Sequence, residues 1–176
     1  LTELDYVNNE QLTEKGRTLS RIYAETDLLL SEMIHAKMLD NLGPAELAAF
    51  VSSLVYEGRG ERSRIPRIPR NIDDIYKETS QIWRRLVLIE DEYGLTTQKE
   101  PNFDLAWSTY RWANGNSLQS VLRETDVLVG DFVRNMRQVI DLLNQLRDVR
   151  TDWAPRITSA IKSIDRGVIA YSTVIL

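Results

Sequence analysis

The sequence predicts an all-α protein, a bundle of about seven helices. Over long stretches the apolar residues recur three and four positions apart, the spacing that places them on one face of a helix. The connections between these stretches are short and carry glycine, proline or asparagine, and almost no segment alternates apolar and polar residues as a strand does. A length of 176 residues and a hydrophobic content of 43% suit one packed domain.

The chain begins with a short irregular segment, residues 1–13. Within it, Asn8-Asn9 predicts a turn between two brief extended pieces. Gly16 is expected to break this segment before the first long helix.

A long helix is expected over residues 17–39, and a second helix over residues 45–57. Pro44 fits the first turn of the second helix, because a missing N–H has no partner to lose there. Residues 58–70 contain two prolines and no periodicity, which predicts a loop. A third helix is expected over residues 73–93, and Gly94 is expected to cap its C-terminal end. The remaining helices are expected over residues 103–113, 117–124, 131–149 and 155–174.

The helix over residues 131–149 carries two different stripes. Its apolar stripe consists of Phe132, Val133, Met136, Val139, Ile140, Leu143 and Leu146. Its polar stripe consists of Arg134, Gln138, Asp141, Gln145 and Asp148, with Arg137 and Asn144 beside it. Arginines, amides and a carboxylate in one row are donors and acceptors suited to sugar and phosphate groups. The alternative is an ordinary amphipathic helix with a solvated face.

The residues around this helix resemble a known family. Trp112, Gly115, Ser117 and Leu118 form W-x-x-G-x-S-L, and G-D-F-V-R follows at residues 130–134. This wording resembles the C-terminal domain, known as DSHCT, of Ski/Mtr/HelY-type ATP-dependent RNA helicases of superfamily two, most of all the bacterial HelY branch. Three further segments resemble the family in the right order: residues 12–34, 42–57 and 165–170. The resemblance covers nearly the whole chain.

The resemblance implies a role for the helix that contains the polar stripe. In these helicases the helix corresponding to residues 131–146, called the ratchet helix, lies under the two ATPase domains and touches the single strand. Arg134 and Arg137 match basic positions of the family, and Asp141 matches a position usually held by glutamate. Gln138 departs from the arginine found in many relatives, which lowers the positive charge but keeps a group that can bond a sugar hydroxyl or base edge. The expected nucleic-acid-binding residues are Arg134, Arg137, Gln138, Asp141 and Gln145.

The resemblance also implies a domain division and partners. Residues 1–16 match the tail of a preceding winged-helix domain, and residues 17–176 match the DSHCT helical bundle with its loop at residues 58–70. The implied partners are single-stranded RNA, with DNA as an open alternative, and the ATPase domains of the same polypeptide. We expect no cofactor in this chain, since ATP and Mg²⁺ would belong to the parent helicase.

The loop at residues 58–70 is basic. It contains Arg59, Arg62, Arg64, Arg67 and Arg70 against the single acidic residue Glu61. Guanidinium groups pair well with phosphates, so the loop could hold a nucleic-acid backbone. The alternative is a solvated connector that Ile65 and Ile68 attach to the bundle.

Several residue patterns resemble parts of metal, nucleotide or base-stacking sites, but none of them is expected to form such a site. Glu32 and His35 have the spacing of a di-iron ligand pair, but such sites need a second copy and this chain has one histidine. Asp91-Glu92 resembles part of a Walker B box but ends a predicted helix, and no G-x-x-x-x-G-K-[ST] loop is present. The tryptophans fall on otherwise apolar helix faces, which favours core packing over base stacking: Trp83, Trp107, Trp112 and Trp153. We expect neither a metal site nor an enzyme in this chain.

Composition limits the remaining classes. A net charge of −4 argues against a free-standing nucleic-acid binder, so any such contact must be local. Zero cysteines exclude a disulfide framework and fit a reducing cytoplasm. With no long apolar run and no charged-then-apolar start, we expect no membrane span or signal peptide, and a cytoplasmic monomer.

The sequence therefore predicts a C-terminal accessory domain of an ATP-dependent RNA helicase that tracks the strand without chemistry of its own. The alternative is a helical interaction module that docks on the helicase core or on a nuclease partner.

The chain by itself should neither bind nor hydrolyse ATP, because its sequence has no phosphate-binding loop. Equilibrium binding with a fluorescent ATP analogue and a phosphate-release assay would check this. Turnover that co-purifies with the chain through two different chromatographic steps would contradict it.

Overall fold

The computed structural model describes residues 1–58 and 67–171, and this part of the chain is an all-α bundle, as predicted. The helices are α1 Glu14–Leu19, α2 Asp27–His35, α3 Pro44–Val55, α4 Asp73–Glu92, α5 Ala106–Ala113, α6 Leu118–Leu122, α7 Val129–Val149, α8 Ala154–Ile164 and α9 Val168–Tyr171. Three 3₁₀ turns precede longer helices: η1 Arg70–Ile72, η2 Phe103–Leu105 and η3 Thr151–Trp153. The only sheet in the described residues is an antiparallel pair, β1 Val7–Asn8 and β2 Gln11–Leu12.

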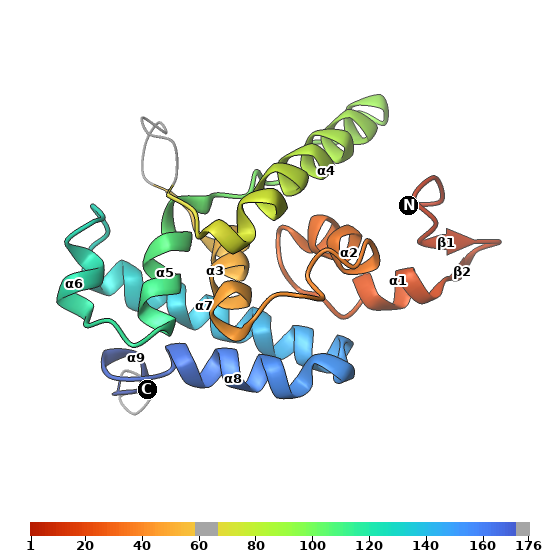
Figure 1. Ribbon diagram of the computed structural model, residues 1–176. Coiled ribbons are helices and arrows are strands. Elements are labelled where there is room, and N and C mark those ends of the chain that lie inside the picture. Colours follow the sequence, from red (N-terminus) through yellow and green to blue (C-terminus); the bar gives the residue numbers. More distant parts are fainter. Residues whose placement is uncertain (59–66, 172–176) are drawn as a thin grey trace.

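Helix α3 is the centre of the bundle, with α5, α7 and α8 packed around it (Figure 1). Every residue from position 47 to position 54 is buried. A helix that is apolar on all sides must be covered on all sides. Its two buried hydroxyls satisfy themselves within the helix, since Ser52 donates to the Ala49 carbonyl at 2.7 Å and Ser53 to the Phe50 carbonyl at 2.6 Å. Pro44 opens the helix, as expected.

The single long helix predicted over residues 17–39 is wrong. Residues 20–26 separate α1 from α2, and this break lets Ile22 enter the core with 3% of its surface exposed. Thr26 is also buried and donates its hydroxyl to the Leu54 carbonyl at the end of α3, at 3.2 Å. The break is therefore set by contacts with α3, which helical periodicity does not report.

Gly16 does not break the chain but lies inside α1. A Cβ at this position would collide with the carbonyl oxygen of Tyr6, so the close approach of hairpin and helix requires glycine. The turn predicted at Asn8-Asn9 is confirmed one residue further on, where Asn9 and Glu10 have φ of 47° and 63°.

The predicted helix over residues 155–174 is also interrupted. It ends at Ile164, and the chain turns at Gly167, with φ of 52°, before α9 begins. The indole N–H of Trp112 donates to the Ile164 carbonyl at 2.8 Å, which stabilises the helix end at this point. Residues 172–174 of the prediction lie outside the described residues.

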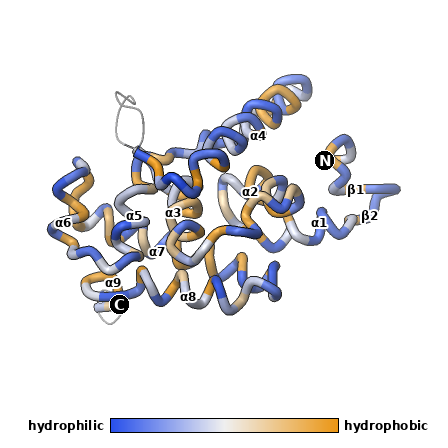
Figure 2. Tube along the Cα trace, viewed as in Figure 1, coloured by the Kyte–Doolittle hydropathy of each residue, from blue (hydrophilic) through white to orange (hydrophobic). Residues whose placement is uncertain are grey.

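Helix α4 projects from the bundle beyond its contact with α2 (Figure 1). Hydrophilic and hydrophobic residues alternate in short groups along it, in keeping with a helix packed on one side (Figure 2). Gly94 caps its end as predicted, with φ of 66° and a hydrogen bond from Leu95 N to the Glu90 carbonyl at 3.0 Å.

The N-terminal hairpin is attached to α2 through a buried tyrosine. Tyr6 is fully buried, and its hydroxyl donates to Glu32 at 2.7 Å. Lys15 pairs with the same carboxylate at 2.5 Å and lies over the Tyr6 ring. Burial raises the pKa of Tyr6, so its hydroxyl stays a donor. The assignment of residues 1–16 to a preceding domain stays a prediction.

No helix in the described residues is both long enough and apolar enough to cross a membrane.

Replacing Leu143 with alanine should reduce the free energy of unfolding by about 2–5 kcal/mol, because the side chain is fully buried and would leave a cavity. Urea denaturation would measure the loss. Gln138→Ala on the exposed face of the same helix is the control and should cost less than about 0.5 kcal/mol. Equal losses in the two variants would contradict this packing of α7.

Candidate nucleic-acid interface

Helix α7 divides into a buried face and an exposed face, largely as predicted. Phe132, Met136, Val139, Leu143 and Leu146 are buried, together with Asn135 and Leu142, which were not predicted, whereas Val133 and Ile140 are half-buried. Arg134, Gln138, Asp141 and Asp148 are exposed, and Gln145 is half-buried. The polar stripe is therefore a continuous surface along the helix.

Arg134 is the accessible arginine of this stripe. Its side chain is 65% exposed, and its partner is Asp131 one turn earlier at 3.2 Å. Because solvent screens the exposed guanidinium, its pair with the half-buried Asp131 contributes modestly to stability.

Arg137 lies at the edge of the stripe and is half-buried. Its guanidinium donates to the Ile169 carbonyl of α9 at 3.4 Å. This contact joins α7 to α9, so Arg137 has a structural partner that the sequence did not indicate.

Three of the predicted residues line one pocket. Gln138, Asp141 and Gln145 face a cavity of about 390 Å³ between α7, the α1–α2 connection and the end of α3. The full lining consists of Tyr23, Ala24, Glu25, Leu54, Val55, Glu57, Lys99, Gln138, Asp141, Leu142 and Gln145. Buried apolar side chains of Leu54 and Leu142 contribute to its wall, and polar side chains provide the rest.

Lys99 bridges two carboxylates of this pocket. Its ammonium pairs with Glu25 at 2.8 Å and with Glu57. Burial lowers the pKa of Lys99, but the hydrogen bonds to the two carboxylates outweigh it and raise the pKa above its ordinary value. The hydrogen bond from Lys99 in turn lowers the pKa of Glu57. Both partners therefore remain charged at neutral pH.

The lining carries an excess of negative charge. Glu25, Glu57 and Asp141 bring three carboxylates, and Lys99 brings one ammonium. Phosphate would be repelled inside the pocket, whereas hydroxyl and amino groups would find acceptors there. Positive charge for a phosphate comes from Arg134, which lies close enough to Glu57 to lower its pKa.

Gln145 has a structural task within the same pocket. Its side-chain oxygen accepts the backbone N–H of Tyr23 at 2.7 Å and so holds the α1–α2 connection against α7. Only its amide NH₂ group remains for a ligand.

Lys99 is placed by a buried glutamate at the end of α4. Glu90 accepts the backbone N–H groups of Thr97 and Gln98 at 2.9 and 3.0 Å, together with both of their side chains. This folds residues 95–98 back on α4 and directs the next residue into the pocket.

The sequence did not indicate Tyr23, Glu25, Glu57 or Lys99 as site residues. They lie in connections or beyond a helix end, where no periodic spacing marks them.

The predicted basic loop is described only in part. Arg59, Arg62 and Arg64 lie outside the described residues. Arg70 is exposed in η1, and Arg67 is exposed and pairs with Glu124 at 2.9 Å.

The Glu32 and His35 pair does not form a metal-ligand set. Glu32 is engaged by Tyr6 and Lys15, and His35 is exposed. Within residues 1–58 and 67–171, no cluster of three or more histidine, aspartate or glutamate side chains could hold a metal ion.

The chain belongs to the DSHCT (NUC185) domain family, which matches residues 9–172. It is 35% identical to the probable helicase HelY of Mycobacterium tuberculosis, over 97% of this chain and 21% of HelY. It is 26% identical to the ATP-dependent RNA helicase mtr4 of Schizosaccharomyces pombe, over 96% of this chain and 16% of that protein. Human exosome RNA helicase MTR4 is 23% identical over 96% of this chain and 17% of its own length. The resemblance inferred from the sequence is confirmed, and the chain spans about a fifth or less of each relative.

Stability should fall as the solution becomes acidic, in part because of Glu90. Burial raises the pKa of Glu90, but the hydrogen bonds from Thr97 and Gln98 outweigh it and leave the pKa below its ordinary value of 4.5. The stabilisation is therefore fully present above that value and is lost as pH falls through the lower pKa of the folded state.

Urea denaturation of the parent and of Glu90→Gln between neutral and acidic pH would measure this contribution. The amide variant should lose less stability on acidification than the parent, since it has no carboxylate to protonate at this position. Parallel curves for the two proteins would contradict the assignment.

Proposed function

We propose that this chain is an accessory domain of an ATP-dependent RNA helicase that contacts single-stranded RNA through the exposed face of α7. The observation that carries the proposal is the placement of Gln138, Asp141 and Gln145 on one pocket, next to the exposed Arg134. Membership of the DSHCT family supports it, since the relatives named above are helicases, two of them RNA helicases by name.

The charges suggest how a strand would lie on this face. Arg134 would pair with a phosphate outside the pocket, where its side chain is 65% exposed. The acidic lining would take an uncharged group rich in donors, such as a ribose hydroxyl or the amino edge of a base. Phosphates would remain outside, so the strand would be oriented with its backbone toward Arg134.

Such contacts are weak enough to be made and released repeatedly. Exposed ion pairs are screened by salt, and the amide of Gln138 adds no charge. A helix that releases the RNA strand after each translocation step would allow the ATPase domains of the same polypeptide to move along it. ATP and Mg²⁺ would be bound by those domains, and this chain would position the strand.

A second candidate function is docking of a protein partner. It is favoured by the projecting end of α4, where Leu88, Tyr93 and Leu95 are 65%, 67% and 51% exposed. Exposed large apolar side chains are found at contact surfaces.

Replacing Arg134 and Gln138 together with alanine should weaken binding of single-stranded RNA about tenfold. A charge-assisted hydrogen bond contributes about 1.5–3 kcal/mol when it is well made, and exposure reduces this value. Fluorescence anisotropy with a labelled oligouridylate at several salt concentrations would measure the affinity. The double variant should also show a shallower dependence of affinity on salt, because one phosphate contact is lost.

Arg84→Ala is a matched control, because it removes an exposed arginine from α4. Figure 1 shows that α4 projects from the bundle, apart from α7. This variant should bind RNA nearly as well as the parent chain. The proposal fails if the α7 double variant binds like this control. Loss of binding to the remaining helicase polypeptide on changing Leu88 and Tyr93 to serine, with RNA affinity unchanged, would favour the docking function instead.

A further inference from the structure

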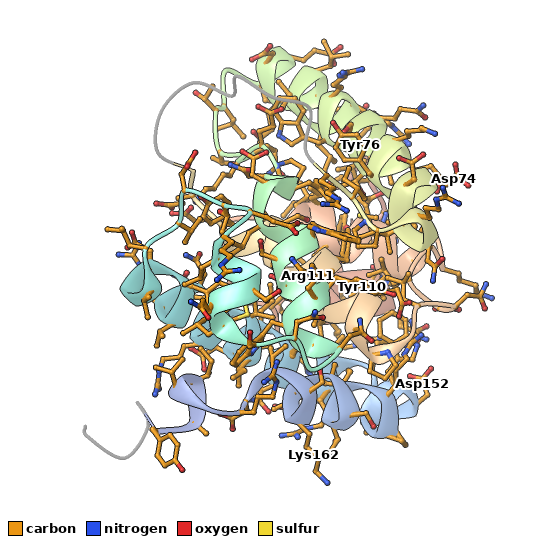
Figure 3. The ribbon with its side chains drawn as sticks, turned by 60° about the vertical axis from the view of Figure 1, so that its left-hand side comes forward. Asp74, Tyr76, Tyr110, Arg111, Asp152 and Lys162 are labelled. Carbon is orange, nitrogen blue, oxygen red and sulfur yellow. The ribbon has the colours of Figure 1, made fainter. Side chains whose placement is uncertain are left out.

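Helix α5 carries a small aromatic surface that the proposed function does not use. Trp107 and Tyr110 are half-buried and stack with ring centroids 5.9 Å apart and an interplanar angle of 23°. The guanidinium of Arg67 lies over the Trp107 ring at 4.1 Å from its centre. Tyr110 and its neighbour Arg111 are seen on this helix in Figure 3.

The arginine over Trp107 is held differently from the arginines over the buried tryptophans Trp112 and Trp153. Arg166 lies over Trp112 but donates to the carbonyls of Trp112 and Asn116 at 2.6 and 2.7 Å. Arg156 lies over Trp153 and likewise donates to backbone carbonyls, those of residues 39, 40 and 42. These two arginines are fixed parts of the fold.

Arg67, in contrast, can leave the ring without breaking the fold. Its side chain is 64% exposed, and it bonds to Glu124, which is itself 42% exposed. An exposed pair of this kind contributes little to stability. Trp107 is thus covered on this face by a planar cation whose only hydrogen-bond partner among the described residues is a surface carboxylate.

Glu124 would keep Trp107 in place after Arg67 has moved. One carboxylate oxygen accepts the indole N–H of Trp107 at 3.1 Å, and the other pairs with Arg111 at 2.8 Å. Arg111 is in turn held by the hydroxyl and carbonyl oxygens of Ser120, at 2.6 and 3.2 Å. The indole is therefore oriented by contacts that do not depend on Arg67.

We propose that Trp107 and Arg67 form a second contact for single-stranded nucleic acid, separate from α7. A base stacks on the indole in place of the guanidinium plane, and Arg67 exchanges Glu124 for a phosphate of the same strand. The guanidinium already occupies the position that a planar base would take over the ring. Stacking on an indole accepts any base, and arginine supplies the charge for the backbone.

The charge of the surrounding sequence favours a polyanion over an acidic peptide. Arg67 belongs to the segment 58–70, in which five arginines stand against one glutamate. A nucleic-acid strand also brings a planar base next to each phosphate, so it can occupy the indole face and Arg67 together, whereas an acidic peptide offers carboxylates for Arg67 but no planar ring for the indole. The contact also suits a single strand better than a duplex, whose bases are already stacked.

The test uses two probes that carry the same charge: an oligouridylate and an abasic ribose-phosphate strand of equal length. Trp107→Leu should weaken binding of the oligouridylate about fivefold to tenfold and leave binding of the abasic strand unchanged. Trp107→Phe, which keeps an aromatic face, should recover most of the loss. Tyr93→Leu removes another exposed aromatic ring, 67% exposed at the end of α4, and should have no effect on either probe.

Quenching of tryptophan fluorescence provides an independent measurement if the leucine variant folds poorly. Oligouridylate should quench the parent chain and should quench Trp107→Phe much less, since the stacked indole is then absent. Undiminished quenching in that variant would overturn the proposal.

Three other results would also overturn it. Trp107→Leu could weaken binding of the abasic strand as much as binding of the oligouridylate, which would show that the loss does not come from base stacking. Trp107→Leu could bind both probes like the parent, or the site could bind a polyglutamate peptide in preference to the oligouridylate. The two proposals can fail separately. Adding Trp107→Leu to the variant with alanine at Arg134 and Gln138 should weaken oligouridylate binding by the same factor as it does in the parent chain. If the α7 double variant binds like the parent chain and Trp107→Leu still weakens binding, only the α7 proposal fails.

Discussion

The burial of every residue from 47 to 54 in α3 is the constraint on which the rest of this structure depends. With residues 47–54 all buried, the helix needs cover on every side, and α5, α7 and α8 provide it. The carbonyls at its C-terminal end must also find donors inside the protein. Thr26 supplies one to Leu54, and the backbone N–H of Asn102 supplies one to Ser53 at 2.7 Å. These two bonds bring the α1–α2 connection and the segment before η2 to the end of α3, where the pocket lies.

The position of α7 follows from the same constraint. Its apolar face covers α3 and α8, so its polar face is left for solvent and for the pocket beside the end of α3. The candidate interface thus depends on a helix whose orientation is determined by packing on the opposite side. Side chains on the outer face can then be selected for binding without cost to the core.

Several arginines of this chain hold the fold together instead of adding charge to its surface. Arg156 joins α8 to the carbonyls that follow α2, Arg166 joins the α8–α9 turn to the end of α5, and Arg137 joins α7 to α9. Burial lowers the pKa of Arg156 and of Arg166, in keeping with guanidinium groups enclosed by protein. The net charge of the chain is −4, and its exposed arginines include Arg134 and Arg67. Recognition of a polyanion by this domain would therefore be local.

The sequence by itself determined the helical class, the two faces of α7 and the family. These features depend on residue spacing and order, which are local properties of the chain. The tertiary structure alone decided where helices stop: residues 20–26 leave the helical path because Ile22 and Thr26 meet α3, and Ile164 ends α8 beside Trp112. It also decided which side chains share a site, since Lys99 reaches Glu25 and Glu57 across the chain only after Glu90 has folded its segment back. Contacts between residues so distant in sequence follow from the shape of the packed core, and no spacing along the chain encodes them.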